Sequence, residues 1–303
     1  MEVIVHDTIA AQRAILEAAP EQRLANCRDR LLEPLRPTWA PMLGLMPQSA
    51  GADADTEARS AARMIGLFNL QADPAENLAA LDRLAAADAQ GTLRAALARA
   101  ARAFTEAGRA LPMDKVEGSI VLGDQENRYF MDTVHGYSGS GAILGYVIIT
   151  IWPNDYTLPR LGPAAVHEFH HNMRLHYAPF TMNISVGEYI VLEGLAESFT
   201  AALYRPDLVG PWVTGLSPAE IDLSRGIIGQ ALDVSGFNNV RPYLFGDPAA
   251  ASSGYSPVGL PACAGYAIGY RVVQAYLLRT GRTIIEATFT PAAEIIAESG
   301  YFA

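Results

Sequence analysis

The sequence predicts a mostly helical α+β fold, and three features lead to that prediction. Apolar residues recur at helical spacing over much of the chain, most clearly in the Ala-rich stretch from Thr56 to Gly108. Two segments rich in β-branched residues, Ser119–Leu122 and Tyr146–Trp152, have the composition of strands. The third feature is a pair of histidines four residues apart, His167 and His171, which a helix would place on one face.

The size and composition of the chain indicate a globular protein. Its 303 residues are enough for one large domain or two smaller ones. Half of the residues are hydrophobic and 18% are charged, which is typical of a folded chain rather than a disordered one. The net charge of −10 argues against a general nucleic-acid binder and against polybasic attachment to a membrane.

The cysteines and the start of the chain bear on the cellular compartment of the protein. Cys27 and Cys263 are far apart in the sequence, and we expect two buried or half-buried thiols in a reducing compartment. The first residues have neither a basic segment nor a long apolar one, so no leader peptide is expected. We therefore expect a cytoplasmic protein with no membrane partner, and the sequence leaves its oligomeric state open.

The sequence changes at Val116 from an Ala-rich helical pattern to segments with the composition of strands, and we place a domain boundary there. Residues 1–115 are predicted to form a helical N-terminal region that starts with a short strand at Glu2–Val5. Within it, the small and polar segment Gln48–Asp55 is predicted to be a loop. This region has no reactive cluster, so we expect a scaffold, with substrate clamping as the alternative. Residues 116–303 are expected to form the catalytic domain.

The histidine pair belongs to the pattern His-Glu-x-x-His. If the segment is helical, the imidazoles of His167 and His171 leave one face a turn apart, as two ligands of one tetrahedral zinc must. Glu168 would then face the open coordination position, where a carboxylate can take a proton from an attacking water. A proline suits a first helical turn, and Pro179 ends the pattern, so the helix is predicted over Pro163–Tyr177.

A second predicted helix supplies a third ligand. It begins at a capping box that starts with Ser185, and it carries Glu193 and Glu197 four residues apart. A glutamate beside two histidines completes one well-known class of catalytic zinc site. We assign Glu193 to the metal and Glu197 to a hydrogen bond with the far nitrogen of a ligating histidine. Three alternatives stay open: the reverse assignment of the glutamates, His170 as a ligand, and a solvated helix face.

These motifs resemble those of a known family. His167–His171 followed by Glu193–Glu197 looks like the gluzincin group of zinc metallopeptidases, and more narrowly like the YjaZ-like predicted zinc-dependent proteases, a domain of unknown function. Their pattern includes a later Gly-Tyr-rich segment, here Gly265–Tyr270. The resemblance extends from about Ser119 to the C-terminus. It implies a gluzincin-like α+β catalytic domain with a small sheet beside the zinc helix.

The resemblance also implies a way to bind substrate. In gluzincins an edge strand beside the zinc helix takes up an extended peptide as an added strand. Tyr146–Trp152 is the candidate, although ordinary sheet pairing explains that segment equally well. A donor besides zinc often stabilises the oxyanion, and Tyr266 is the first candidate here, with Tyr270 and His135 as others. For each of these three, a packed aromatic or a surface histidine is the simpler interpretation.

Other segments bear on the alternatives. The Gly-rich stretch Gly136–Gly141 is followed by a strand rather than a helix, which argues against a phosphate-binding loop. Gly236–Pro261 is predicted to be a long loop or lid, whereas Ala264–Leu278 and Ala292–Glu298 are predicted to be helices.

The sequence thus predicts a zinc metallohydrolase that acts as a peptidase. Its expected cofactor is Zn²⁺, and its expected substrate is a peptide or a small amide. Two alternatives are a zinc enzyme acting on a small amide or ester, which a closing lid would favour, and a non-catalytic partner-binding protein. The predicted site residues are the metal ligands His167, His171 and Glu193, the general base Glu168, the oxyanion donor Tyr266 and the supporting residue Glu197.

Overall fold

The computed structural model describes residues 1–44 and 53–303, and the chain forms two compact units. Unit 1 comprises residues 1–99 and 113–168, and unit 2 comprises residues 100–112 and 169–303. The predicted domain boundary at Val116 does not coincide with this division, and a separate helical N-terminal domain stays a prediction. Most of the loop predicted at Gln48–Asp55 lies outside the described residues.

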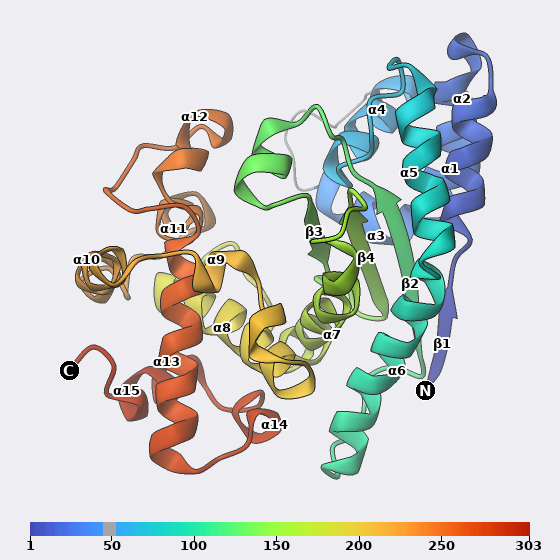
Figure 1. Ribbon diagram of the computed structural model, residues 1–303. Helices are drawn as coiled ribbons and strands as arrows, with labels where there is room; N and C mark the ends of the chain where they lie inside the picture. Colours follow the sequence, from blue (N-terminus) through green and yellow to red (C-terminus); the bar gives the residue numbers. More distant parts are fainter. Residues whose placement is uncertain (45–52) are drawn as a thin grey trace. The chain divides into compact units, whose positions relative to one another are not determined.

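A four-stranded sheet forms the centre of unit 1 (Figure 1). Strand β2 (Lys115–Leu122) pairs in parallel with β1 (Glu2–Val5) on one side and with β4 (Tyr146–Ile151) on the other. Strand β3 (Tyr137–Ser140) then pairs antiparallel with β4 and ends the sheet. The strands expected near the N-terminus and within β2 and β4 are confirmed.

The prediction that Tyr146–Trp152 supplies the edge strand is wrong. In β4, Ile148 pairs with Ser119 of β2 on one side and with Ser140 of β3 on the other. The sequence of β4 is almost continuously apolar, as expected for a strand buried on both faces rather than for an exposed edge. The edge strand next to β4 is β3, which comes from the Gly-rich stretch, and β1 forms the other edge.

Helices of the N-terminal segment pack on this sheet. Buried Gln12 of α1 bonds the carbonyl oxygen of Ile120 and the N–H of Leu122, which lie beyond the end of the shorter β1. Gly118 of β2 leaves room for Leu93 and Leu97 of α6. The α-helices between β1 and β2 are α1 (Thr8–Glu17), α2 (Arg23–Cys27), α3 (Arg36–Leu43), α4 (Ala54–Met64), α5 (Pro74–Ala86) and α6 (Ala89–Glu106).

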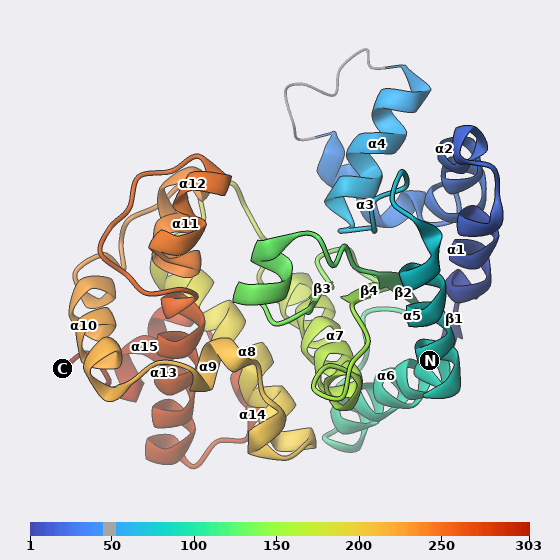
Figure 2. The same cartoon turned by 45° about the horizontal axis from the view of Figure 1, so that its top comes forward.

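Unit 2 is helical, and α13 (Ala264–Thr280) is its central element (Figure 2). Helices α8, α9, α10, α11 and α15 all pack against α13. The capping box predicted at the start of α8 is present, and α10 begins with a second one at Ser217. The other helices are α8 (Val186–Leu203), α9 (Pro211–Thr214), α10 (Pro218–Gly229), α11 (Phe237–Phe245), α12 (Ala250–Ser253), α14 (Ile284–Ala287) and α15 (Ala292–Ser299).

The prediction of a long loop over Gly236–Pro261 is also wrong. The segment contains α11 and the short α12, and Val240 and Leu244 of α11 are buried. Its glycine and proline residues indicated irregular structure, but burial of the apolar residues stabilises a helix around Pro242. Among the described residues, no helix is both long and apolar enough to cross a bilayer.

Candidate metal centre

Helix α7 (Leu161–Tyr177) carries the histidine motif, and it begins two residues before the predicted start. His167 and His171 lie one turn apart on this helix, and each residue is nearly buried, at 8% exposure. The boundary between the units falls inside α7, after Glu168, so the helix belongs to both units. The fully buried Val166 and Phe169 hold the helix in place.

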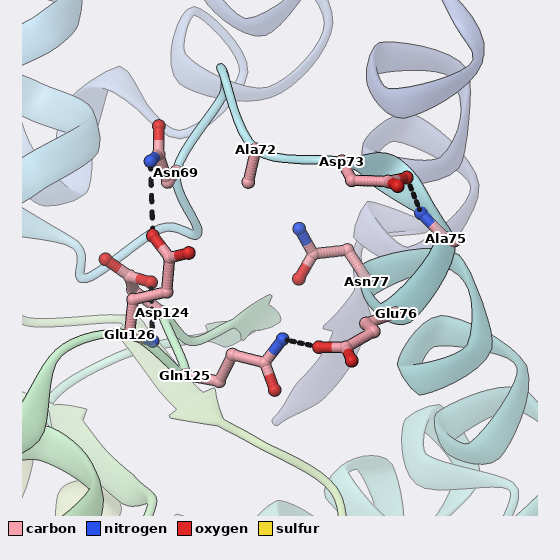
Figure 3. A pocket seen from close by; sticks show the side chains of 9 residues that line it. All are labelled: Asn69, Ala72, Asp73, Ala75, Glu76, Asn77, Asp124, Gln125 and Glu126. Atoms are coloured by element: carbon pink, nitrogen blue, oxygen red, sulfur yellow. Dashed lines mark hydrogen bonds between the residues drawn. The ribbon is translucent and has the colours of Figure 1, made fainter.

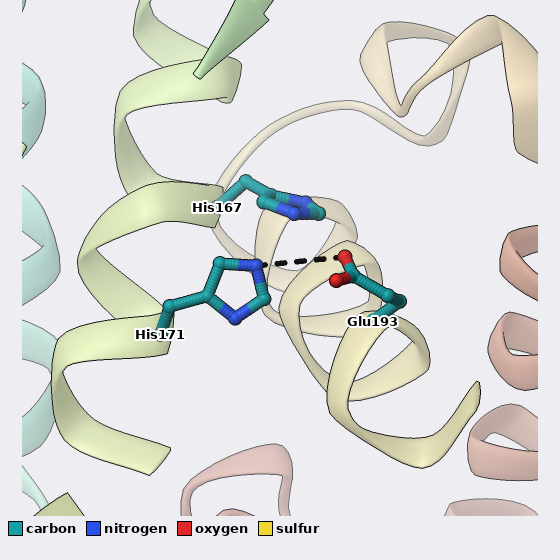
Figure 4. A group of neighbouring side chains, drawn as sticks. All are labelled: His167, His171 and Glu193. Carbon is teal, nitrogen blue, oxygen red and sulfur yellow. Dashed lines mark ion pairs between the residues drawn. The ribbon is translucent and has the colours of Figure 1, made fainter. Parts of the chain in front are cut away.

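Helix α8 brings a carboxylate to the two imidazoles (Figure 4). His167, His171 and Glu193 each offer a ligand atom, and these three atoms lie within 4.8 Å of one another. The distance from Nε2 of His171 to Oε2 of Glu193 is 3.5 Å. Donors about 2.1 Å from a tetrahedral zinc are about 3.4 Å apart, so this buried set fits the ion in size and in chemistry.

The neighbouring candidates have other surroundings. Among the described residues, the group of converging metal donors includes neither His170 nor Glu197. His170 is fully buried, its Nε2 lies 3.0 Å from Oγ1 of Thr288, and its ring packs against Phe104 and Phe199. These contacts are those of a core histidine that fixes the position of α7.

Glu197 is buried one turn after Glu193, and its carboxylate has two described donors. It accepts a hydrogen bond from the backbone N–H of Gly210 at 3.0 Å and one from the indole of Trp212 at 2.6 Å. The Trp212 ring also contacts the ring of Tyr266, with centroids 6.0 Å apart. The predicted bond from Glu197 to a ligating histidine stays a prediction, as does the role of Tyr266.

The glycines of two motifs explain how α8 reaches its position. A Cβ atom on Gly194 would clash with the backbone of Gly269, and a Cβ atom on Gly269 would clash with the carbonyl of Ile190. Helices α8 and α13 therefore cross with their backbones in contact, which only glycine permits. This crossing fixes the position of Glu193 relative to α13. It also brings the Glu-Gly-Leu-Ala-Glu motif into contact with the Gly-Tyr-rich segment.

Glu168 lies against the edge strand β3. A Cβ atom on Gly139 would come within 2.5 Å of the Glu168 carboxylate, and one on Gly141 would overlap the backbone of Glu168. The Gly-rich stretch is therefore needed for close approach of strand and helix rather than for phosphate binding. Sequence reasoning missed this role, although two glycines spaced by one residue at the end of a strand are a recognisable signal of it.

The remaining predicted residues lie as follows. His135 packs against the ring of Tyr156, with centroids 5.8 Å apart. Burial and then the charge of Glu197 raise the pKa of Tyr270, so its hydroxyl stays protonated. Arg174 is buried near the end of α7, and its guanidinium donates to the carbonyl oxygens of Thr288 and Thr290, both at 2.7 Å. Arg174 therefore ties α7 to the segment after α14.

Comparison with known proteins places this site in a family. The family model described as predicted Zn-dependent protease (DUF2268) matches residues 89–297, which include the helices α7, α8 and α13. The chain belongs to this family. The resemblance inferred from the two zinc-helix motifs is therefore confirmed, and the family match covers more than half of the sequence.

Two proteins of Bacillus subtilis (strain 168) are similar to this chain. The uncharacterized protein YjfC is 32% identical over 303 residues, covering 100% of this chain and 99% of YjfC. The uncharacterized protein YjaZ is 29% identical over 142 residues, covering 46% of this chain and 51% of YjaZ. No solved structure gives a significant match. The similarity to YjfC includes helices α1 to α5, which lie before the family match.

Proposed function

We propose that this protein is a zinc-dependent peptidase in which His167, His171 and Glu193 hold the metal. The observation that carries the proposal is the buried set of two imidazoles and one carboxylate within 4.8 Å. Membership in a family of predicted zinc-dependent proteases supports it. When bound at such a site, zinc polarises a scissile carbonyl and makes water acidic enough to attack it near neutral pH.

Glu168 is the proposed general base. It follows a metal ligand on α7, and its carboxylate lies against Gly139 of β3. In the proposed mechanism Glu168 accepts a proton from the attacking water and then donates it to the nitrogen of the leaving amine. Because Glu168 is only 7% exposed, few solvent molecules compete for that proton.

The edge strand supports a peptide as the substrate. Strand β3 ends the sheet, and among the described strands it pairs with β4 alone. An extended peptide added to β3 would run beside the Glu168 carboxylate. A closing lid formed by Gly236–Pro261 would have favoured a small amide, and that segment instead contains α11, so the peptide is the better-supported substrate.

Tyr266 and Glu197 are proposed to support the reaction. Tyr266 is the proposed donor to the oxyanion, and Glu197 is proposed to orient a ligating imidazole. These roles are supported by the contacts that Tyr266 and Glu197 both make with Trp212. Glu197 lies one turn of α8 after Glu193.

A single substitution tests the proposal. We expect Glu168→Gln to retain about one zinc per chain and to lower peptide turnover by at least roughly 100-fold, the range expected for loss of a general base. Glu106→Gln, at an exposed position on α6, is the matched control and keeps both properties. Zinc content is measured by elemental analysis, and turnover with a library of quenched fluorescent peptides.

Three outcomes would contradict parts of the proposal. Full turnover by Glu168→Gln would exclude Glu168 as the base. A zinc-loaded wild type that cleaves small amides or esters but no peptide would favour the small-substrate alternative. A zinc-loaded wild type that cleaves neither class would favour a non-catalytic binding protein.

A further inference from the structure

Unit 1 contains an acidic pocket that shares no residue with the candidate metal centre (Figure 3). Its volume is about 180 Å³, smaller than the roughly 300–1,000 Å³ of pockets for drug-sized ligands. One wall comes from the segment that leads into α5, and the other from the turn after β2. Its lining includes the carboxylates of Asp73, Glu76, Asp124 and Glu126, and it includes no lysine, arginine or histidine.

Asn77 is the buried polar group of this pocket. The residue is only 4% exposed, and its amide points from α5 into the pocket. Among the described residues, none forms a hydrogen bond with this amide. An amide in such a position finds its hydrogen-bond partners in whatever fills the pocket, so Asn77 offers both an acceptor and N–H donors to a bound molecule.

The carboxylates of the pocket are held by neutral donors only. Glu126 accepts a hydrogen bond from the amide of Asn69 at 3.3 Å, and Glu76 accepts one from the amide of Gln125. Asp124 accepts from the backbone N–H of Glu126 at 3.0 Å. Among the described residues, no basic side chain pairs with these carboxylates. Each still has acceptor positions, so the pocket favours a ligand that carries positive charge and several N–H groups.

The spacing of the carboxylates distinguishes an organic cation from a metal ion. Among the described residues, only His167, His171 and Glu193 place three metal donors within 4.8 Å of one another. The acidic side chains of the pocket are more widely spaced and do not converge on one point. They suit an elongated cation whose N–H groups reach separate carboxylates, because one small ion would need them all within bonding distance.

We propose that this pocket binds a small organic cation that carries ammonium or guanidinium groups. The N–H groups of the ligand donate to Glu76 and Glu126 on opposite walls, and Oδ1 of Asn77 accepts a further hydrogen bond between them. Asn77 lies before the family match at residues 89–297, whereas Glu126 lies inside it. The pocket therefore gives the N-terminal region a binding role besides scaffolding, and it does not depend on the proposed peptidase activity.

Titration calorimetry of the zinc-loaded full chain tests the proposal. Agmatine and putrescine are the cationic probes, and 1,4-butanediol is the neutral analogue of putrescine. We expect one agmatine to bind per chain and butanediol not to bind. Glu76→Gln and Glu126→Gln should each weaken agmatine binding roughly tenfold, because each removes one charged acceptor. Glu106→Gln, which removes an exposed carboxylate elsewhere, should leave the affinity unchanged.

Asn77→Leu tests the buried amide separately. It should weaken agmatine binding by a similar factor while the melting temperature stays at or above that of the wild type, because the amide has no partner to lose. The proposal is overturned if the wild type binds neither cation at millimolar concentration or if the two glutamine variants bind agmatine as well as the wild type. Calcium binding that excludes agmatine would instead show a metal site.

Discussion

At the scale of single residues, the partners of buried polar groups distinguish side chains that the sequence treats alike. Glu193 and Glu197 lie one turn apart on α8 and are both buried. Glu193 faces two imidazoles, whereas Glu197 accepts from Gly210 and Trp212. A buried carboxylate needs hydrogen-bond donors or a metal. Glu197 has the donors, whereas Glu193 is placed for the metal.

The histidine pair leads to a prediction about metal content. We expect His171→Ala to lower the zinc content to less than about a tenth of the wild-type value, because two donors cannot hold the ion against the surrounding water. His176→Ala is the matched control, because this exposed histidine on the same helix lies outside the cluster. Equal zinc content in the two variants, measured by elemental analysis, would show that the metal binds elsewhere.

The two cysteines lead to a prediction about reactivity and pH. Both thiols are free and buried, and burial raises the pKa of each from 9.0 to about 12. At pH 8 about one native thiol in 10,000 is ionised, against about one in ten after unfolding. We expect a thiol reagent to modify the native protein far more slowly than the protein in denaturant.

The raised pKa of the two thiols also makes the stability of the native state depend on pH. The native state favours the neutral thiols, so their contribution is fully present below pH 9 and is lost as the pH rises from 9 towards 12. Modification at equal rates with and without denaturant would show that the thiols are accessible.

At the scale of helices and strands, close backbone contacts explain the glycines of the motifs. Gly194 and Gly269 allow α8 and α13 to cross, and Gly139 and Gly141 allow β3 to lie against α7. In both places a methyl group would occupy space already filled by the neighbouring element. The glycines therefore specify distances between elements rather than turns.

The contact of β3 with α7 leads to a prediction about activity. We expect Gly139→Ala to fold and to keep its zinc, because the added Cβ meets the side chain of Glu168 rather than its backbone. The displaced carboxylate should lower peptide turnover by about 100-fold, the effect of misplacing a catalytic group by about 1 Å. Gly226→Ala is the control, because a Cβ atom there meets nothing within 4 Å. Unchanged turnover in Gly139→Ala would remove β3 from the proposed mechanism.

At the scale of the whole molecule, a metal would link ligand binding to folding. Its proposed ligands come from two helices, α7 and α8. A zinc ion held by α7 and α8 binds the native chain far better than the unfolded one, because unfolding separates its ligands. Metal binding therefore adds to the stability of the native state.

Chelation should then lower the melting temperature. A free zinc concentration 1,000 times the dissociation constant stabilises the native state by about 4 kcal/mol. For a chain of this size, we expect chelation to lower the main transition by roughly 10 °C in calorimetry. The His171→Ala variant should show no response to the chelator. A wild-type transition that stays constant after the zinc has been removed would contradict this coupling.

The sequence by itself determined the features that depend on neighbours along the chain. The spacing of His167 and His171 and the capping box at Ser185 each arise within a few residues, and the structure has both where they were predicted. The clustering of Glu193 with both histidines was inferable as well, because a buried carboxylate needs a partner and the histidine helix lies just before it.

Only the tertiary structure decided which distant segments meet. It placed β4 inside the sheet and β3 at its edge, made α11 from a segment rich in glycine and proline, and brought Asn77 to the turn after β2. The physical reason is the separation along the sequence between the residues that make contact. Periodicity and capping report contacts a few residues apart, whereas strand order and pocket walls depend on packing between segments that are far apart in the sequence.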